Sequence, residues 1–276
     1  MQEDSVKVYP GISQSLAIAV IVIFSSVLIL PVNFFLKDVF VKEVNFFVGY
    51  LVSMGGAFAI VWFIRKNITG QAGFNLKTGS SRLVGLSLLA AIATLMGVVI
   101  PLSHFTTQII PIPDFFKEVL KSMGEMRHWA NVLAVVIAAP VLEELIFRGV
   151  MLDGLLKKYS PATAIFVSSF FFALIHLNPW QFVTAMIIGI LIGWVYYHTR
   201  SLSLAIVMHM ANNLFVTLLE FIYPSQDIWE GESSVVEFLG GWVPFATIIG
   251  ISLVVLAVGL FLMKREFATL KSAGKI

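Results

Sequence analysis

The sequence predicts an all-α fold, a polytopic transmembrane helical bundle of about eight spans, from two features of its composition. Hydrophobic residues make up 58% of the 276 residues and charged residues only 12%, whereas soluble domains are about half apolar and a quarter charged. The apolar residues form continuous runs of about 20, the length at which a helix crosses hydrocarbon. The runs do not alternate apolar with polar residues, so a transmembrane β-barrel is not expected.

The predicted spans follow one another along the chain, with most charges at their ends. Within a few residues they cover 13–36, 45–64, 82–104, 129–152, 161–177, 180–198, 201–223 and 239–263. The first run is expected to stay as a helix, because the residues before it mix both charge signs and lack the basic start of a cleaved signal. A shorter amphipathic stretch from Asp114 to Met123 predicts a helix in the membrane interface. We expect one integral membrane domain over residues 1–276.

The orientation follows from the distribution of Lys and Arg, which are enriched in cytoplasmic loops. In an eight-span arrangement one set of loops holds Lys7, Arg65, Lys66, Lys77, Arg82, Lys157, Lys158, Arg200, Lys264, Arg265, Lys271 and Lys275. The opposite set holds Lys37, Lys42, Lys117, Lys121 and Arg127. Both termini are therefore expected in the cytoplasm.

Several classes of function and site are excluded by composition. The absence of cysteine removes disulfides, thiol nucleophiles and thiolate metal ligands. The net charge of +2 is small and scattered, so nucleic acid is not an expected partner.

Gly189 and Gly193 form a GxxxG pair that lets another helix approach closely, and packing within the chain is expected rather than dimerisation. The oligomeric state is left open.

Ionisable groups concentrate in three of the spans, although each costs about 3 kcal/mol near the bilayer centre. The fourth span contains Glu143, Glu144 and Arg148, the fifth ends with His176, and the seventh contains His209 and Asn213. Such residues require either a partner or a function. A structural role is the simplest interpretation of each residue alone, but their coincidence favours a reactive site.

Helical geometry divides the charged residues of the fourth span into two roles. Glu144 and Arg148 are four residues apart and can pair on one face, whereas Glu143 points about 100° away. Glu143 therefore has no counter-charge on its own helix and is the candidate general base, with Phe147 one turn beyond it. Pro140 has no N–H to donate to the carbonyl of Val136, so a kink and a free backbone acceptor are expected there.

The other two spans repeat the four-residue spacing. His209 and Asn213 lie one turn apart, as do Phe172 and His176. A carboxylate, two imidazoles and an amide could converge on one small cavity. Such a set can hydrolyse an amide bond, because a base activates water and donors stabilise the oxyanion.

These motifs resemble those of a known family. Residues 143–148 match EExxxR with a Phe before the Arg, Phe172 to His176 matches FxxxH, and His209 to Asn213 matches HxxxN. In this order they resemble the CAAX protease and bacteriocin-processing family of intramembrane proteases, also called Abi or CPBP, which includes the type II CAAX prenyl endopeptidases. The resemblance implies a protease-like core at about 82–223 and a conical catalytic cavity within the membrane.

The resemblance also implies a role for each motif residue. Glu143 would activate water, with His176 helping to orient it, and His209 with Asn213 would form the oxyanion site. Glu144 and Arg148 would hold the fourth helix in place, supported by Phe147 and Phe172. The implied substrates are membrane-associated or lipidated peptides. A bacterial cell membrane is the expected location.

Three questions are left open by the sequence. The family is often labelled metalloprotease, and Glu143, His176 and His209 could bind zinc, but HExxH is absent and metal-free activation of water is favoured. A proton-coupled transporter could use the same residues as a proton relay, and a scaffold or immunity protein could keep them without catalysis. The predicted depths of the site residues in the membrane also disagree. In this arrangement Glu143 and His209 would lie about 13 Å from the cytoplasmic boundary, whereas His176 would lie about 22 Å along its helix.

Overall fold

The computed structural model describes residues 7–122, 128–222 and 234–276, and all regular structure within these ranges is helical. The first part of the chain contains α1 (Ile12–Val27), α2 (Ile29–Leu36), α3 (Lys42–Thr69), α4 (Ser81–Thr94), η1 (Leu95–Val99), α5 (Ile100–Ile109) and α6 (Asp114–Ser122), where η marks a π-helix. Then follow α7 (Trp129–Leu133), η2 (Ala134–Ala138), α8 (Ala139–Glu144), η3 (Leu145–Leu152), α9 (Asp153–Leu155) and α10 (Pro161–Leu174). The chain continues with α11 (Pro179–Thr199), α12 (Leu202–Ile222), α14 (Val235–Phe238) and α15 (Trp242–Ser272).

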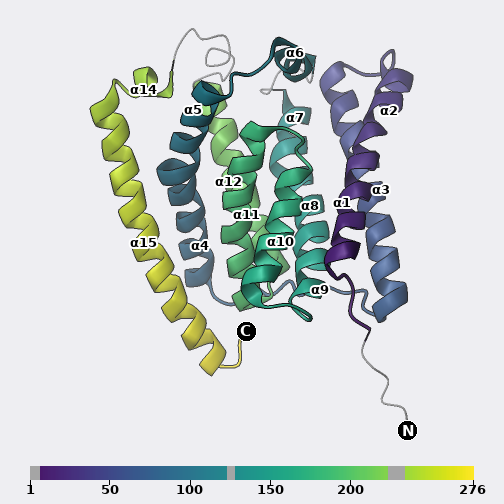
Figure 1. Cartoon of the computed structure of the whole chain (residues 1–276), viewed down its shortest axis with the longest axis vertical. Coiled ribbons are helices and arrows are strands. Elements are labelled where there is room, and N and C mark those ends of the chain that lie inside the picture. The colour runs from purple at the N-terminus through teal and green to yellow at the C-terminus, as the bar shows by residue number, and fades with distance from the viewer. Residues whose placement is uncertain (1–6, 123–127, 223–233) are drawn as a thin grey trace.

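The helices form one bundle (Figure 1). Its centre contains α10, α11 and α12 together with the last helices of the fourth span. Helices α1 to α3 lie on one side of this centre, and α4 and α15 lie on the other. The centre therefore collects the three spans that carry ionisable residues.

Seven helical segments within the described ranges are long and apolar enough to cross a membrane. They are Ile12–Leu36, Lys42–Thr69, Ser81–Ile109, Trp129–Leu155, Pro179–Thr199, Leu202–Ile222 and Trp242–Ser272. The remaining predicted span is α10, which has 14 residues. At 1.5 Å per residue it is about 21 Å long, shorter than the hydrocarbon core of about 30 Å. The predicted bundle of about eight spans is confirmed, and the chain is a multi-pass membrane protein.

Tyr9, which precedes α1, and Ile276, the last residue, lie at the same end of the bundle. Tyr9 packs against Gly154 at the end of the fourth span, and Ile276 packs against Gly79 in the loop before α4. That loop also reaches the end of the fourth span, because Lys157 Nζ donates a hydrogen bond of 2.8 Å to Gln71 Oε1. The assignment of this end to the cytoplasm stays a prediction.

The GxxxG pair packs inside the chain, as expected. A Cβ at Gly189 would lie 3.1 Å from the Cβ of Ser169, and one at Gly193 would lie 3.2 Å from Ile165 Cγ2. Both contacts are made with α10, so the two glycines let α10 and α11 approach closely.

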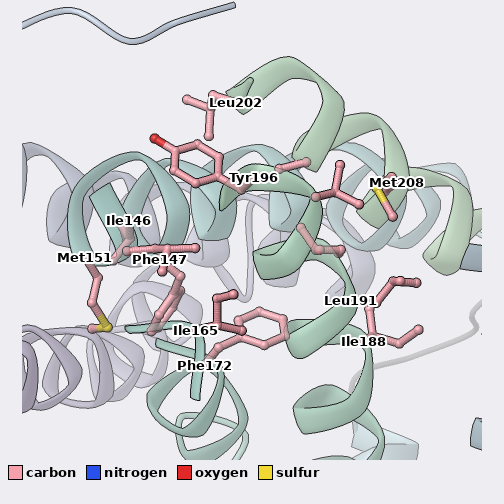
Figure 2. Close-up of a cluster of buried hydrophobic side chains, with 14 of the residues drawn as sticks. Ile146, Phe147, Met151, Ile165, Phe172, Ile188, Leu191, Tyr196, Leu202 and Met208 are labelled. Carbon is pink, nitrogen blue, oxygen red and sulfur yellow. The ribbon is translucent and has the colours of Figure 1, made fainter. Parts of the chain in front are cut away.

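The apolar core lies around these contacts. Ile146, Phe147, Met151, Ile165, Phe172, Ile188, Leu191, Tyr196, Leu202 and Met208 come together from the fourth span, α10, α11 and α12 (Figure 2). The side chain of Phe147 is fully buried and meets the ring of Phe172 edge to face, with 5.4 Å between centroids. Because large side chains fill this region, the polar residues next to it are held in fixed positions.

The predicted amphipathic helix is α6, which lies at the end of the bundle opposite to the start of α1 (Figure 1). Phe116 packs on Trp180 at the start of α11, with 5.3 Å between ring centroids. Trp180 Nε1 also donates a hydrogen bond to the carbonyl of Ile110. Met123, which the prediction included, lies outside the described residues.

Replacing Gly154 by Ala is expected to destabilise the fold by about 1–3 kcal/mol, because overpacking forces backbone shifts. A Cβ at this position would collide with the carbonyl oxygen of Tyr9 and with the ring of Pro10. Thermal unfolding in detergent micelles measures the effect. Gly85 in α4 provides the matched control, since a Cβ there meets nothing within 4 Å and Ala is the better helix former. Equal stability of the two variants would contradict this packing.

Candidate active site

The fourth span is wound as a π-helix on both sides of α8, and this winding shifts its hydrogen-bond register. The N–H of Ala139 donates to the carbonyl of Ala134, five residues earlier. In that register the partner of residue 140 is Val135, but Pro140 has no N–H to donate. The free acceptor in this register is therefore the carbonyl of Val135, whereas the prediction of Val136 assumed α-helical bonding.

Asn213 of α12 uses this free acceptor. Its Nδ2 donates a hydrogen bond of 2.8 Å to the carbonyl oxygen of Val135, and its Oδ1 accepts one of 3.1 Å from Asn212 Nδ2. The amide thus joins α12 to the fourth span at its π-wound turn. One N–H of the Asn213 amide remains for another acceptor.

Glu144 and Arg148 form the predicted pair, and both side chains are buried. The distance from Arg148 Nη1 to Glu144 Oε1 is 2.7 Å, with the carboxylate 0% and the guanidinium 1% exposed. Arg148 also donates from Nη2 to the carbonyl of Gly189 at 3.1 Å, and its guanidinium lies 4.6 Å from the centroid of the Phe172 ring. These contacts tie the fourth span to α10 and α11.

His209 lies between the two glutamates of the fourth span. Its Nδ1 lies 2.8 Å from Glu144 Oε1, a hydrogen bond within the buried cluster, while its Nε2 lies 3.9 Å from Glu143 Oε2. Because an ionised carboxylate only accepts hydrogen bonds, the bond to Glu144 places a proton on Nδ1. Glu144 therefore orients the imidazole, and Nε2 is the ring atom that faces Glu143.

Tyr50 of α3 is a site residue that the sequence did not indicate. Its hydroxyl donates a hydrogen bond of 2.8 Å to Glu143 Oε1. No motif contains it, and 93 residues separate it from Glu143. The available signal was a tyrosine within an apolar span, because a buried hydroxyl usually finds a polar partner.

His176 is close to this cluster, but its hydrogen bond is made elsewhere. It lies two residues after Leu174, the last residue of α10, and its Nδ1 lies 3.0 Å from the carbonyl oxygen of Phe172. The Phe172 ring meets the imidazoles of both His176 and His209 edge to face, at centroid distances of 5.4 and 5.5 Å. The predicted role of His176 in orienting Glu143 stays a prediction.

The structure thus brings Glu143, Glu144, Arg148 and His209 into one hydrogen-bonded and charged cluster beside Phe172. Arg148 is paired with Glu144, and His209 is hydrogen-bonded to the same carboxylate. A charge paired in this way is far less costly in a low-dielectric interior than an isolated charge.

An apolar groove of about 300 Å³ runs between α3 and the fourth span. Phe47 and Leu51 of α3 line one side, and Ile137, Val141 and Leu142 line the other. These residues are close in sequence to Tyr50 and Glu143, so the groove lies near the carboxylate. The predicted conical cavity stays a prediction.

The candidate zinc ligands Glu143, His176 and His209 do not form a metal site in this arrangement. Among the residues that the structure describes, no group of three or more His, Asp and Glu side chains could hold a metal ion. The Nδ1 atom of His176 is hydrogen-bonded to the carbonyl oxygen of Phe172 in α10.

The central spans are similar to those of known proteins. Residues 125–215 match the family described as type II CAAX prenyl endopeptidase Rce1-like. A relative from Bacillus subtilis (strain 168), "Putative membrane peptidase YdiL", is 22% identical over 197 residues, which cover 69% of this chain and 78% of that protein. No solved structure matches the chain. The matched residues contain all three motifs, and the resemblance to the CAAX protease and bacteriocin-processing family is confirmed.

Proposed function

From the Rce1-like domain that this chain carries over residues 125–215, we propose that it is an intramembrane endopeptidase in which Glu143 activates water. One observation carries the proposal. Glu143 Oε1 is bonded to Tyr50 and His209 Nδ1 to Glu144, which leaves Glu143 Oε2 and His209 Nε2 facing each other at 3.9 Å. A water molecule about 2.9 Å from each of these two atoms would bridge them.

The reaction follows from the roles of these two atoms. Glu143 takes a proton from water, and the water oxygen attacks the carbonyl carbon of the peptide bond. In the imidazolium form, His209 donates from Nε2 to the oxyanion that develops on the carbonyl oxygen. The carbon–nitrogen bond then breaks, and Glu143 returns the proton to the leaving amine. The remaining N–H of Asn213 could serve as a second oxyanion donor.

The proposed substrates are membrane-associated or lipidated peptides. Two features support this class. The reactive side chains lie within apolar spans, and the nearby groove between α3 and the fourth span is lined by apolar side chains. A peptide carried on an apolar anchor can place that anchor in the groove or in lipid while its peptide bond reaches Glu143.

Replacing His209 by Ala is expected to lower the cleavage rate by about 10²- to 10³-fold, the usual cost of losing an oxyanion donor. The measurement uses purified protein in lipid vesicles and a panel of membrane-anchored fluorogenic peptides. His198→Ala is the matched control, because His198 lies in α11 and contacts Trp194 and Phe267 away from the cluster. A zinc chelator is expected to leave the rate unchanged.

Each other outcome has a defined meaning. Full activity of His209→Ala would show that His209 has no part in the mechanism. Loss of activity with the chelator would show that zinc, and not a carboxylate alone, activates the water. A wild-type protein that cleaves none of the peptides would contradict the proposed function and favour a proton relay or a scaffold.

A further inference from the structure

We infer that Tyr50 is a positioning residue for Glu143, an inference that rests on the proposed function. Tyr50 lies outside the residues that match the family, on α3. Its hydroxyl donates to the carboxylate that acts as the base. The site is therefore completed by a helix that precedes the matched domain.

The hydrogen bond distinguishes the two oxygens of Glu143. Oε1 is held by the Tyr50 hydroxyl at 2.8 Å, and Oε2 is the oxygen nearest to His209 Nε2. A carboxylate without this bond can rotate about its last torsion, which is broad and has no strong preference. With the bond in place, one oxygen stays directed at the position of the attacking water, as a near-attack geometry requires.

The contacts of Tyr50 fit a fixed donor. The side chain is half-buried, and the ring of Phe46, one turn earlier on α3, lies 6.4 Å from the Tyr50 ring between centroids. Phe47 and Leu51, which flank Tyr50 on the same helix, line the apolar groove. The groove therefore lies beside the turn of α3 that carries Tyr50.

The alternative is that the hydrogen bond only joins α3 to the fourth span. The two roles predict different kinetics. Replacing a positioning residue lowers kcat and leaves KM unchanged, because the bond matters only to the geometry of the base in the transition state. Replacing a residue that only joins two helices lowers thermal stability and leaves the kcat of the folded protein unchanged.

The test is Tyr50→Phe in the full-length protein, which removes one oxygen atom and keeps the ring. Loss of a hydrogen bond to a charged carboxylate is expected to lower kcat by about tenfold to hundredfold, with KM unchanged. Tyr159→Phe is the matched control, since the Tyr159 hydroxyl contacts the N–H of Ile12 at 3.4 Å, at the end of the bundle. Its kcat is expected to equal that of the wild type.

Measurement of wild type and Glu143→Gln on the same peptide distinguishes the possible failures. If wild type cleaves, Glu143→Gln does not, and Tyr50→Phe has wild-type kcat, the role of Tyr50 is overturned and the proposed function stands. A Tyr50→Phe variant that loses thermal stability with unchanged kcat would assign the bond to helix packing. A wild type that cleaves no peptide would overturn the proposed function and this inference together.

Discussion

Replacing Glu143 by Gln is expected to reduce peptide cleavage by about 10²- to 10⁴-fold, because a positioned general base contributes that much to proton transfer. The amide keeps the size of the side chain and an oxygen that can still accept from Tyr50, but it cannot take a proton from water. The protein is therefore expected to fold normally, with unchanged KM. Initial rates on a fluorogenic peptide in vesicles measure the effect.

Glu266→Gln is the control for this substitution. Glu266 undergoes the same chemical change, but its carboxylate accepts from Ser80 Oγ at 2.7 Å and pairs with Arg82 at 3.7 Å, away from the cluster. Its cleavage rate is expected to match the wild type. Comparable activity of Glu143→Gln and Glu266→Gln would show that Glu143 is not the base.

Replacing Arg148 by Leu is expected to destabilise the protein by about 3–5 kcal/mol, because removing one partner leaves a buried charge uncompensated. Glu144 is fully buried and would keep only His209 as a partner for the oxygen that Arg148 contacts. The carbonyl of Gly189 would also lose the hydrogen bond from Arg148 Nη2. Thermal or denaturant unfolding in micelles measures the loss.

The double variant Glu144→Leu with Arg148→Leu is the informative comparison. It removes both charges, so its cost in stability is expected to be smaller than that of Arg148→Leu alone. Its activity should still be low, because His209 Nδ1 loses the carboxylate that orients the ring. A double variant less stable than the single variant would show that the charge of Glu144 is compensated elsewhere.

Much of the fold could be predicted because it depends on local patterns. Continuous apolar runs identified the spans, and the four-residue spacing of Glu144 and Arg148 gave their ion pair. The lengths were less well predicted, since the third span continues to Ile109 and the last to Ser272. Apolar length alone does not show where a helix ends outside the hydrocarbon.

The partners of the site residues could not be predicted from spacing. The sequence placed His209 and Asn213 together as donors, but His209 is held by Glu144 and Asn213 is bonded to Val135. Both contacts depend on how α12 packs against a π-wound helix. Tyr50 was missed for the same reason, because its contact joins helices that are distant in sequence.

The role of Glu143 is tested most directly by a single turnover of the wild-type protein in H₂¹⁸O, followed by mass spectrometry of the peptide products and of the protein. If Glu143 activates water, the new carboxylate of the product carries one ¹⁸O atom and the Glu143 side chain carries none. Label in the Glu143 carboxylate after one turnover would show that the glutamate attacks the peptide bond itself, which would contradict its assignment as a general base.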